Sequence, residues 1–423
     1  MPQHLLTRRA FLQAALASAG ALSLSAPGAG AAQNPGTSAI QEKTGKHHTA
    51  TAGIKLFLSG DVKTGRGIDQ ILRHRVDPRI YEPWITDARD YIALAEDMNG
   101  PIERPVDDAY VWGDALGTLG AHKPAARIIN LETAITSGGE PWPRKGIHYR
   151  MHPANSGLLL AAGIDACVLA NNHMLDWGYD GLEETLQTLD RAGIHHAGAG
   201  PDARGAAAPA SIPLPSGKRL LLFAFAFPTS GVPHAWAARR DRPGVNLVMD
   251  PGSEAVDAIT RHIAGERRPG DIVVASIHWG GNWGYEIAPE KRQFAHALID
   301  AGVVDVVHGH SSHHPVGIEV YRNKLVLYGC GDLLNDYEGI AEHGRYRGDL
   351  SLMYFPVLSP QDGHLLGLEM HAMQIRKLRL NTASESDTRL LQQILDREGA
   401  RFSTGVEWRG GNRLALAWRQ LTM

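Results

Sequence analysis

The chain has 423 residues, which is enough for a large hydrophobic core in one or two domains. Its formal net charge of −3 argues against a nucleic-acid partner and against a basic membrane-binding patch. The unusual count is 21 histidines, because histidine is the commonest metal ligand in proteins. Cys167 and Cys330 lie in apolar segments without a CxxC motif, which favours two buried free thiols and leaves a disulfide as the alternative.

The N-terminal residues have the pattern of an export signal. Arg8 and Arg9 precede a mild apolar run over 14–24, and the small residues that follow suit a signal peptidase. We predict a twin-arginine signal peptide over 1–32, with an ordinary secretory signal or a retained anchor as alternatives. The run is too short and too rich in small residues to make a good transmembrane helix. The expected location is therefore periplasmic or extracellular, either free or associated with the membrane.

The first two predicted strands end in acidic residues. An apolar run over 54–59 is followed by Gly60 and Asp61, and a second predicted strand over 126–132 ends in Asn130 and Glu132. Ligand-binding groups of open α/β sheets gather at the carboxyl ends of strands. These two carboxylates are therefore candidate ligands. Shortly after the first strand, Arg66 lies between two glycines at the start of a predicted helix, where it could contact an anion.

A third predicted strand, over 164–170, is followed by the polar sequence Asn171-Asn172-His173 and then by Asp176. Buried amides need hydrogen-bond or metal partners, so adjacent asparagines at a strand end are hard to explain by packing alone. The helix that follows is predicted to have Asp180 as its N-cap and to end at Gly193.

Histidines follow two later strands. The run over 271–277 leads to His278, and the short run over 305–307 leads to a glycine turn that holds His308, His310 and His313. Clustered imidazoles at a strand end are typical of metal ligands. The alternatives are that histidines collect in a turn by chance, and that His278 is an ordinary core residue. Residues 220–227 form an apolar strand without a polar end, which predicts a structural role.

Strands that alternate with helices predict an α/β fold with a mainly parallel sheet. The carboxyl ends of such strands meet at one edge, so the carboxylates, the amide and the imidazoles should converge on one or two divalent cations. We predict a linker over 33–50, the main domain over 51–380, and a short C-terminal extension of one helix and a hairpin over 381–423.

Five motifs in order are similar to the CapA family of exported proteins associated with poly-γ-glutamate capsule synthesis. They are G-D-V-x-x-G-R, N-L-E, N-N-H-x-x-D-x-G-x-x-G-L, H-W-G and G-H-x-x-H-x-x-x-G-I-E-V-Y, and together they cover about 54–337. The resemblance implies a calcineurin-like metallophosphoesterase fold, an α-β-β-α sandwich with metals at the strand ends.

The resemblance also assigns roles to residues of this chain. It implies that His173 is a general acid, with Arg66 as an anion contact and Asp176 as the residue that orients His173. It implies a divalent metal site, with Mn, Zn or Fe as candidates, whose ligands are Asp61, Glu132, Asn172, His278, His310 and His313. The wider superfamily has Asp-x-His after its first strand, whereas this chain has Asp61-Val62-Lys63, so a lysine replaces one usual ligand.

The function implied by the resemblance is metal-dependent hydrolysis or transfer of γ-glutamyl bonds in an anionic polymer such as poly-γ-glutamate. Membrane subunits of capsule synthesis are then candidate partners. Two alternatives stay open: a periplasmic metallophosphoesterase, which the implied fold favours, and a protein that binds or assembles polymer without turnover, which the lysine at position 63 favours.

Overall fold

The computed structural model describes residues 53–340 and 346–419, and these residues contain two large β-sheets. The ten-stranded sheet, called the large sheet below, has in spatial order β19 (Thr404–Trp408), β20 (Arg413–Trp418), β17 (Leu365–Ile375), β16 (Leu350–Leu358), β1 (Ile54–Val62), β2 (Ala126–Leu131), β5 (Ala166–Val168) and β6 (His195–Ala197), with β15 (Asp332–Leu334) beside β1 and β18 (Leu380–Thr382) beside β17. The six-stranded sheet, called the small sheet, has β13 (Ile318–Tyr321), β14 (Lys324–Leu327), β12 (Val306–His310), β11 (Ile272–His278), β9 (Arg219–Ala226) and β8 (Ala210–Pro213).

Both sheets mix parallel and antiparallel pairs. In the large sheet β1, β2, β5 and β6 run parallel, whereas β16, β17, β20 and β19 are antiparallel to their neighbours. In the small sheet the four central strands run parallel, and β8 and β13 add antiparallel edges. The α/β class is therefore confirmed, but both sheets are mixed, whereas the strand pattern predicted a mainly parallel sheet. The calcineurin-like sandwich stays a prediction.

The alternating side chains of β9 explain how the sheets are layered. Leu220 and Leu222 join the core shared with the large sheet, whereas Leu221 and Phe223 join a second core on the opposite face. That second core is completed by α8 (Ser253–Glu266) and α9 (Pro289–Asp300). Each fully buried leucine or phenylalanine contributes about 1.5–3 kcal/mol, so both faces of the small sheet are strongly held.

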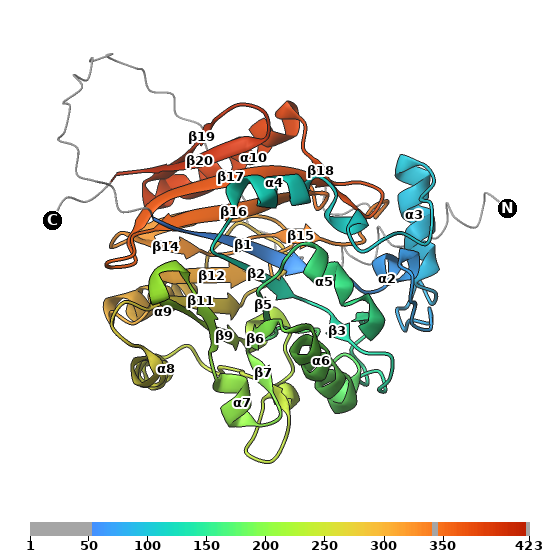
Figure 1. Cartoon of the computed structure of the whole chain (residues 1–423), viewed down its shortest axis with the longest axis horizontal. Helices are drawn as coiled ribbons and strands as arrows, with labels where there is room; N and C mark the ends of the chain where they lie inside the picture. The colour runs from blue at the N-terminus through green and yellow to red at the C-terminus, as the bar shows by residue number, and fades with distance from the viewer. Residues whose placement is uncertain (1–52, 341–345, 420–423) are drawn as a thin grey trace, which may run out of the picture.

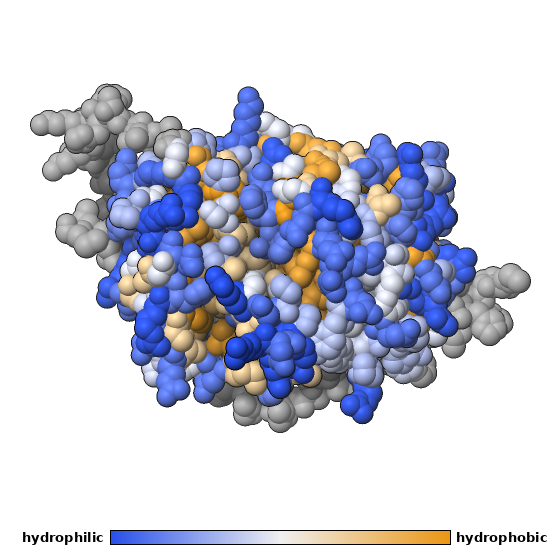
Figure 2. Space-filling model, turned by 60° about the horizontal axis from the view of Figure 1, so that its bottom comes forward, coloured by the Kyte–Doolittle hydropathy of each residue, from blue (hydrophilic) through white to orange (hydrophobic). Residues whose placement is uncertain are grey.

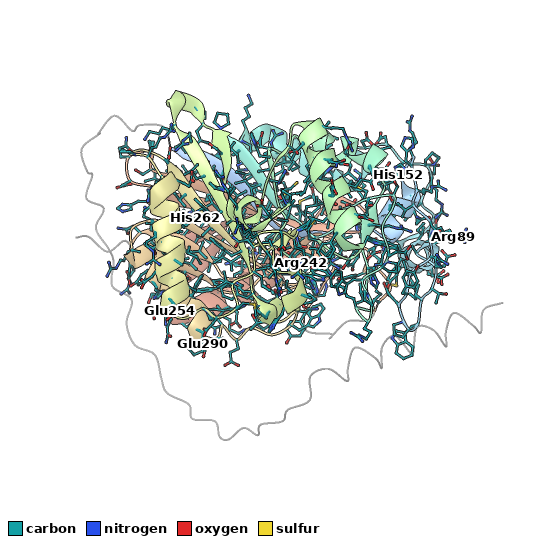
Figure 3. All side chains as sticks on the ribbon, turned by 90° about the horizontal axis from the view of Figure 1, so that it is seen from below. Arg89, His152, Arg242, Glu254, His262 and Glu290 are labelled. Carbon is teal, nitrogen blue, oxygen red and sulfur yellow. The ribbon has the colours of Figure 1, made fainter. Side chains whose placement is uncertain are left out.

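Helices cover the outer surface of both sheets (Figure 1). In Figure 1, α8 and α9 lie beyond β11, on the side away from β16 and β17. In Figure 3, His262 and Glu254 mark positions along α8, and Glu290 marks the start of α9 beside it. The other α-helices of the described residues are α2 (Gly67–Ile71), α3 (Arg89–Asn99), α4 (Ala115–His122), α5 (Gly157–Ala161), α6 (Gly178–Ala192), α7 (Ala203–Ala207) and α10 (Glu385–Gly399). Two further two-stranded sheets pair β3 (Ala134–Ile135) with β4 (Arg150–Met151) and β7 (Ala199–Gly200) with β10 (Gly244–Val245).

The C-terminal residues continue the large sheet. β20 pairs with β17, β19 pairs with β20, and α10 packs on β19. The predicted signal peptide over 1–32 and the linker over 33–50 lie outside the described residues. Among the helices of the described part, none is long and apolar enough to cross a membrane. The face in Figure 2 is mostly hydrophilic, with hydrophobic residues in small separate groups.

Candidate functional site

The predicted ligand residues come together where strands of both sheets end. Asp61 lies near the end of β1, Glu132 follows β2, and Asn172 follows β5, whereas His278 and His310 end β11 and β12 of the small sheet. Asn172 is half-buried and the other four are buried. Strands aligned in parallel register place their ends side by side, and His278 is the direct neighbour of His310 across the β11–β12 pair.

Asp61, His278 and His310 offer ligand atoms that all lie within 4.8 Å of one another, and we call them the first donor group. His310 Nδ1 lies 4.0 Å from Asp61 Oδ1 and 2.7 Å from His278 Nδ1. His278 Nε2 lies 3.1 Å from Asn172 Oδ1 and 3.9 Å from Glu132 Oε1. These atoms are close enough together to bind one cation, because metal bonds to nitrogen and oxygen are about 2.0–2.2 Å long.

A chain of hydrogen bonds fixes which nitrogen of His310 carries the proton. His308 Nε2 must donate to the Ser59 carbonyl at 2.8 Å, so His308 Nδ1 accepts from the Ser276 hydroxyl at 3.0 Å. Ser276 Oγ then accepts from His310 Nε2 at 2.9 Å. The assignment holds for neutral rings, and burial lowers the pKa of His308 to about 4. His310 therefore presents the Nδ1 lone pair to the first donor group.

With the Asn172 amide oxygen facing its ring, His278 cannot satisfy both neighbours with one proton. A proton on its Nδ1 leaves Nε2 facing Asn172 Oδ1 as acceptor against acceptor, and a proton on Nε2 leaves two Nδ1 lone pairs 2.7 Å apart. Double protonation is disfavoured, because burial holds the pKa of His278 well below its usual value. In addition, Asp61 Oδ2 is buried and makes no hydrogen bond within the described residues, and it lies 3.7 Å from the Lys63 ammonium. The donors of this group thus fit a cation.

A second donor group consists of Asp61, His313 and Asp332, and it contains the side chain of Lys63. The Lys63 ammonium donates to Asp332 Oδ1, lies 3.0 Å from Glu132 Oε2, and is 3.2 Å from His313 Nδ1. Lys63 is 1% exposed. Burial lowers the pKa of Lys63, but the surrounding carboxylates more than reverse this, so that its pKa is raised well above the usual value.

The three carboxyl groups of the site differ in their pKa values for physical reasons. Burial raises the pKa of Asp61, and the neighbouring Glu132 raises it further. Burial also raises the pKa of Glu132, which Lys63 only partly offsets. Burial acts in the same direction on Asp332, but His313 and Lys63 outweigh it and lower its pKa. Asp332 is thus the carboxylate that Lys63 neutralises most directly. Asp61 and Glu132 have too little positive charge near them to offset the effect of burial on their pKa values.

His173 and Asp176 form a hydrogen-bonded pair next to these ligands. His173 Nδ1 lies 2.7 Å from Asp176 Oδ2 and 3.2 Å from the Lys145 ammonium, and the shorter contact with the carboxylate favours a proton on Nδ1 that is donated to Asp176. His173 Nε2 lies 3.6 Å from Glu132 Oε1. Lys145 holds the other oxygen of Asp176 at 2.8 Å. Burial raises the pKa of Asp176 to about 6 despite Lys145, whereas burial and then Lys145 hold the pKa of His173 well below its usual value. His173 is therefore a neutral imidazole with Nε2 available.

Arg66 is buried, and its guanidinium is already paired. Its Nε donates to Asp336 at 3.1 Å, its Nη1 donates to Glu82 and to Tyr91 at 2.8 Å, and its Nη2 donates to Asp336. The two carboxylates leave Arg66 little excess positive charge. Arg66 lines a cavity next to the site. There its guanidinium lies over the Tyr149 ring and helps to hold the cavity wall in place.

A cavity of about 360 Å³ opens above the site. Asn172, His173 and His313 line it together with Lys145 and Arg66. Most of the remaining wall is aromatic or aliphatic, and consists of Trp84, Tyr91, Ile147, Tyr149, Trp283, Tyr337 and Ile340 with Glu82, Pro83, Gly231 and Asn282. Concave, largely apolar pockets with a few convergent polar groups are typical binding sites.

Comparison with known proteins decides the family. The family described as "Bacterial capsule synthesis protein PGA_cap" matches residues 55–337, which is well over half of the chain. This chain belongs to that family. The CapA resemblance read from the sequence motifs is therefore confirmed, and the match covers every residue of the two donor groups and the His173–Asp176 pair.

Curated relatives of this capsule synthesis family member come from several bacteria. A probable polyglutamine synthesis accessory protein of Mycobacterium tuberculosis (strain CDC 1551 / Oshkosh) is 46% identical over 364 residues, which cover 86% of this chain and 96% of the relative. The capsule biosynthesis protein CapA of Bacillus anthracis is 27% identical over 196 residues, 45% of either chain. The PGA biosynthesis protein CapA of Bacillus subtilis (strain 168) is 29% identical over 192 residues, which cover 45% of this chain and 48% of the relative.

The set of site residues predicted from the sequence of this family member was incomplete. The predicted ligands did not include Asp332, although Gly331-Asp332 repeats the Gly60-Asp61 pair and Asp61 and Asp332 are neighbours across β1 and β15. The predicted set also omitted Lys145, which lies in a loop without a strand end to mark it. A further group, His122, Glu369 and His371, also brings potential ligand atoms within 4.8 Å, but it lies on α4 and β17 and shares no residue with the two donor groups.

Proposed function

We propose that this protein cleaves or transfers γ-glutamyl amide bonds of poly-γ-glutamate at a centre that holds a divalent cation. The observation that carries the proposal is the convergence of imidazole, amide and carboxylate donors beside a neutral histidine and below a cavity. Membership of a capsule synthesis family supports the polymer as substrate. The names of the relatives, which refer to polyglutamine and PGA biosynthesis, support it further.

The cavity wall suits a γ-linked glutamate chain. Such a chain has two methylene groups between successive amides and carries its α-carboxylates as side groups. Aromatic faces such as those of Trp84, Trp283 and Tyr149 pack well against methylene groups. Lys145 at the same wall supplies a donor for carboxylate or amide oxygens, and Arg66 presents a face of its guanidinium to the cavity.

His173 is placed to move the proton that amide cleavage requires. Its Nδ1 proton is held by Asp176, so Nε2 can accept a proton from the attacking water and return it to the departing amine. The water oxygen bonds to the carbonyl carbon, the carbon–nitrogen bond breaks, and the amine leaves with the proton. Positioned acid–base groups of this kind contribute about 10²–10⁴-fold to the rate.

The residues that would hold the cation are Asp61, His278 and His310, with Asn172 and Glu132 at their border. Mixed imidazole and carboxylate donors suit Mn²⁺, Zn²⁺ or Fe²⁺. When bound, the cation supplies a Lewis acid that polarises the scissile carbonyl. Asn172 and His173 are adjacent in the chain, so the ligand and the proton carrier share one rigid turn after β5.

We further propose that the protein acts after export, because its polymer substrate belongs to the cell envelope and residues 1–32 have the pattern of a twin-arginine signal. Replacement of Arg8 and Arg9 by lysine should then keep the protein inside the cell. Cell fractionation with an antibody measures this. Unchanged export of the double variant would contradict the twin-arginine route.

The test of the proposed activity uses purified protein reconstituted with Mn²⁺ or Zn²⁺ and poly-γ-glutamate of defined length. We expect shortened chains on gels and one new amino group per cleavage, with both lost after chelation and in His173→Gln. A chromogenic phosphoester run in parallel separates the competing activities. Turnover of the phosphoester without polymer cleavage would support a metallophosphoesterase, and polymer binding without either reaction would support an assembly protein.

A further inference from the structure

The two donor groups differ in whether their lone pairs are already used. In the second group, Asp332 Oδ1 accepts from the Lys63 ammonium and Asp332 Oδ2 accepts from Asn335 at 2.9 Å. Asp61 belongs to both groups: its Oδ1 accepts from the Asn130 amide at 2.7 Å, and its Oδ2 lies 3.7 Å from the Lys63 ammonium. In the first group, the Nδ1 atoms of His278 and His310 face each other at 2.7 Å. Asp332 in the second group is thus satisfied by the protein itself, whereas the two facing imidazoles of the first group suit a cation from outside.

His313 cannot serve as a ligand through the nitrogen that faces the site. Its Nδ1 lies 3.2 Å from the Lys63 ammonium and 2.9 Å from Asp332 Oδ1. If Nδ1 carries a proton it donates to Asp332, and if it carries a lone pair it accepts from Lys63, which can only donate. In both cases a second metal finds no lone pair there.

The Lys63 ammonium cannot move out of the second donor group. Its backbone N–H donates to the Leu334 carbonyl at 2.9 Å, which fixes the residue between β1 and β15, and its side chain is fully enclosed. An ammonium buried without carboxylate partners would cost several kcal/mol, so it stays among them. A divalent cation bound to the same oxygens would lie within about 3–4 Å of Nζ and be repelled by it.

The charge balance of the site also indicates a single metal ion. Asp61, Glu132 and Asp332 are three carboxylates around one ammonium, which leaves two negative charges uncompensated in a buried site. One divalent cation in the first donor group neutralises them, and two such cations would leave the site with two positive charges. Buried charge that lacks compensation is strongly unfavourable, so the site suits one metal ion.

We propose that the Lys63 ammonium is a built-in cation that takes the place of a second metal, so that this protein binds a single divalent ion at Asp61, His278 and His310. The inference rests on the metal centre of the proposed function and specifies its composition. It also assigns Lys63 a positioning role, in which its ammonium holds Glu132 and Asp332 in the orientation that a second metal would otherwise impose.

The experiment counts metal ions per chain. Wild type, Lys63→His and Lys63→Arg are saturated with Mn²⁺ by dialysis, and bound manganese is measured by elemental mass spectrometry against protein concentration. We expect one ion per chain for wild type and for Lys63→Arg, which keeps the cation. We expect two for Lys63→His, because the shorter imidazole removes the charge and adds a ligand beside Asp332 and Glu132. His371→Ala serves as a control for manganese bound at the His122 cluster.

Two ions in wild type, or one ion in a Lys63→His variant that has the circular dichroism spectrum of wild type, would overturn the inference. If Lys63→His does not fold, the wild-type count alone decides, since one ion supports the inference and two overturn it. A wild-type protein that binds no manganese would overturn this inference together with the metal centre. One bound ion without polymer cleavage would count only against the proposed activity.

Discussion

The tautomer of His310 is the residue-scale feature on which the candidate metal centre depends. The Ser59 carbonyl, His308 and Ser276 together place the ring proton on Nε2 and leave Nδ1 free to bind a cation. Such outer hydrogen bonds orient a metal-binding histidine and raise its basicity. His308 belongs to neither donor group, and its place in this chain of hydrogen bonds gives it a supporting role.

Ser276→Ala should therefore weaken metal binding by about 10–100-fold, because His310 loses the acceptor that fixes its tautomer. Calorimetric titration with Mn²⁺ measures the dissociation constant. Ser351→Ala on β16 is the matched control, since Ser351 is equally buried and its hydroxyl makes no hydrogen bond within the described residues. Equal affinities for wild type and Ser276→Ala would contradict the role of the hydrogen-bond chain.

The pH dependence of the proposed reaction should follow the Asp176 carboxyl, whose pKa of about 6 reflects burial opposed by Lys145. The carboxylate orients His173 and predominates above that pH, so the rate should fall as the pH drops through about 6. Lys145→Met removes the cation that lowers this pKa, and the acid limb should move to higher pH. A profile of kcat against pH measures the shift. An acid limb that does not move in Lys145→Met would contradict this electrostatic role.

At the scale of elements, two glycine–aspartate pairs bring β1 and β15 into close contact. A Cβ on Gly60 would lie 1.7 Å from the Gly331 carbonyl oxygen, and Asp61 N–H donates to that oxygen at 3.0 Å. Gly331 itself has φ +79°, a conformation that other residues rarely adopt. The close approach is what sets Asp61 beside Asp332 in register.

Gly60→Ala should lower the free energy of unfolding by about 1–3 kcal/mol or more, because rigid backbone has to move to admit the methyl group. Gly117→Ala in α4 is the matched substitution, since nothing lies within 4 Å of its added Cβ, and it should raise stability by about 0.5–1 kcal/mol. Urea unfolding followed by circular dichroism measures both. A Gly60→Ala variant as stable as wild type would show that the two strand ends can separate freely.

The strands and helices around the site were predicted more accurately from the sequence than the residues at which they begin and end. The predicted strands over 54–59, 126–132 and 271–277 correspond to β1, β2 and β11, because short apolar runs that end in polar residues are typical of buried strands. The third strand is shorter than expected, since β5 covers only Ala166–Val168. Asp180 was predicted as an N-cap, but α6 begins at Gly178 and Asp180 lies in its first turn.

At the scale of the whole molecule, the first donor group connects the two sheets. Asp61 comes from the large sheet, whereas His278 and His310 come from the small sheet. The strand pattern could not predict this arrangement. A strand that is apolar on both faces is predicted to have both faces buried. Its sequence does not indicate whether a helix or another sheet covers each face. The convergence of strand ends could be predicted, and the pairing of Lys63 with Asp332 could not, because it depends on contacts distant in sequence.

A metal ion that links two sheets should stabilise the folded protein. With Mn²⁺ at about 100 times its dissociation constant, mass action contributes about 2.7 kcal/mol, which should raise the thermal midpoint by several degrees. Asp61→Asn should lose this rise, because it keeps an acceptor for the Asn130 amide but removes the charge. Differential scanning calorimetry with and without Mn²⁺ measures the effect. An equal rise in Asp61→Asn would place the stabilising ion elsewhere.

The most direct measurement is an anomalous difference map from crystals of the wild-type protein grown with Mn²⁺. We predict one strong peak about 2.0–2.4 Å from a ring nitrogen of His278 and from Nδ1 of His310, next to Asp61, with the Lys63 ammonium still bound to Asp332. No peak at this position in manganese-saturated crystals, or a second peak between Asp61 and Asp332, would contradict it.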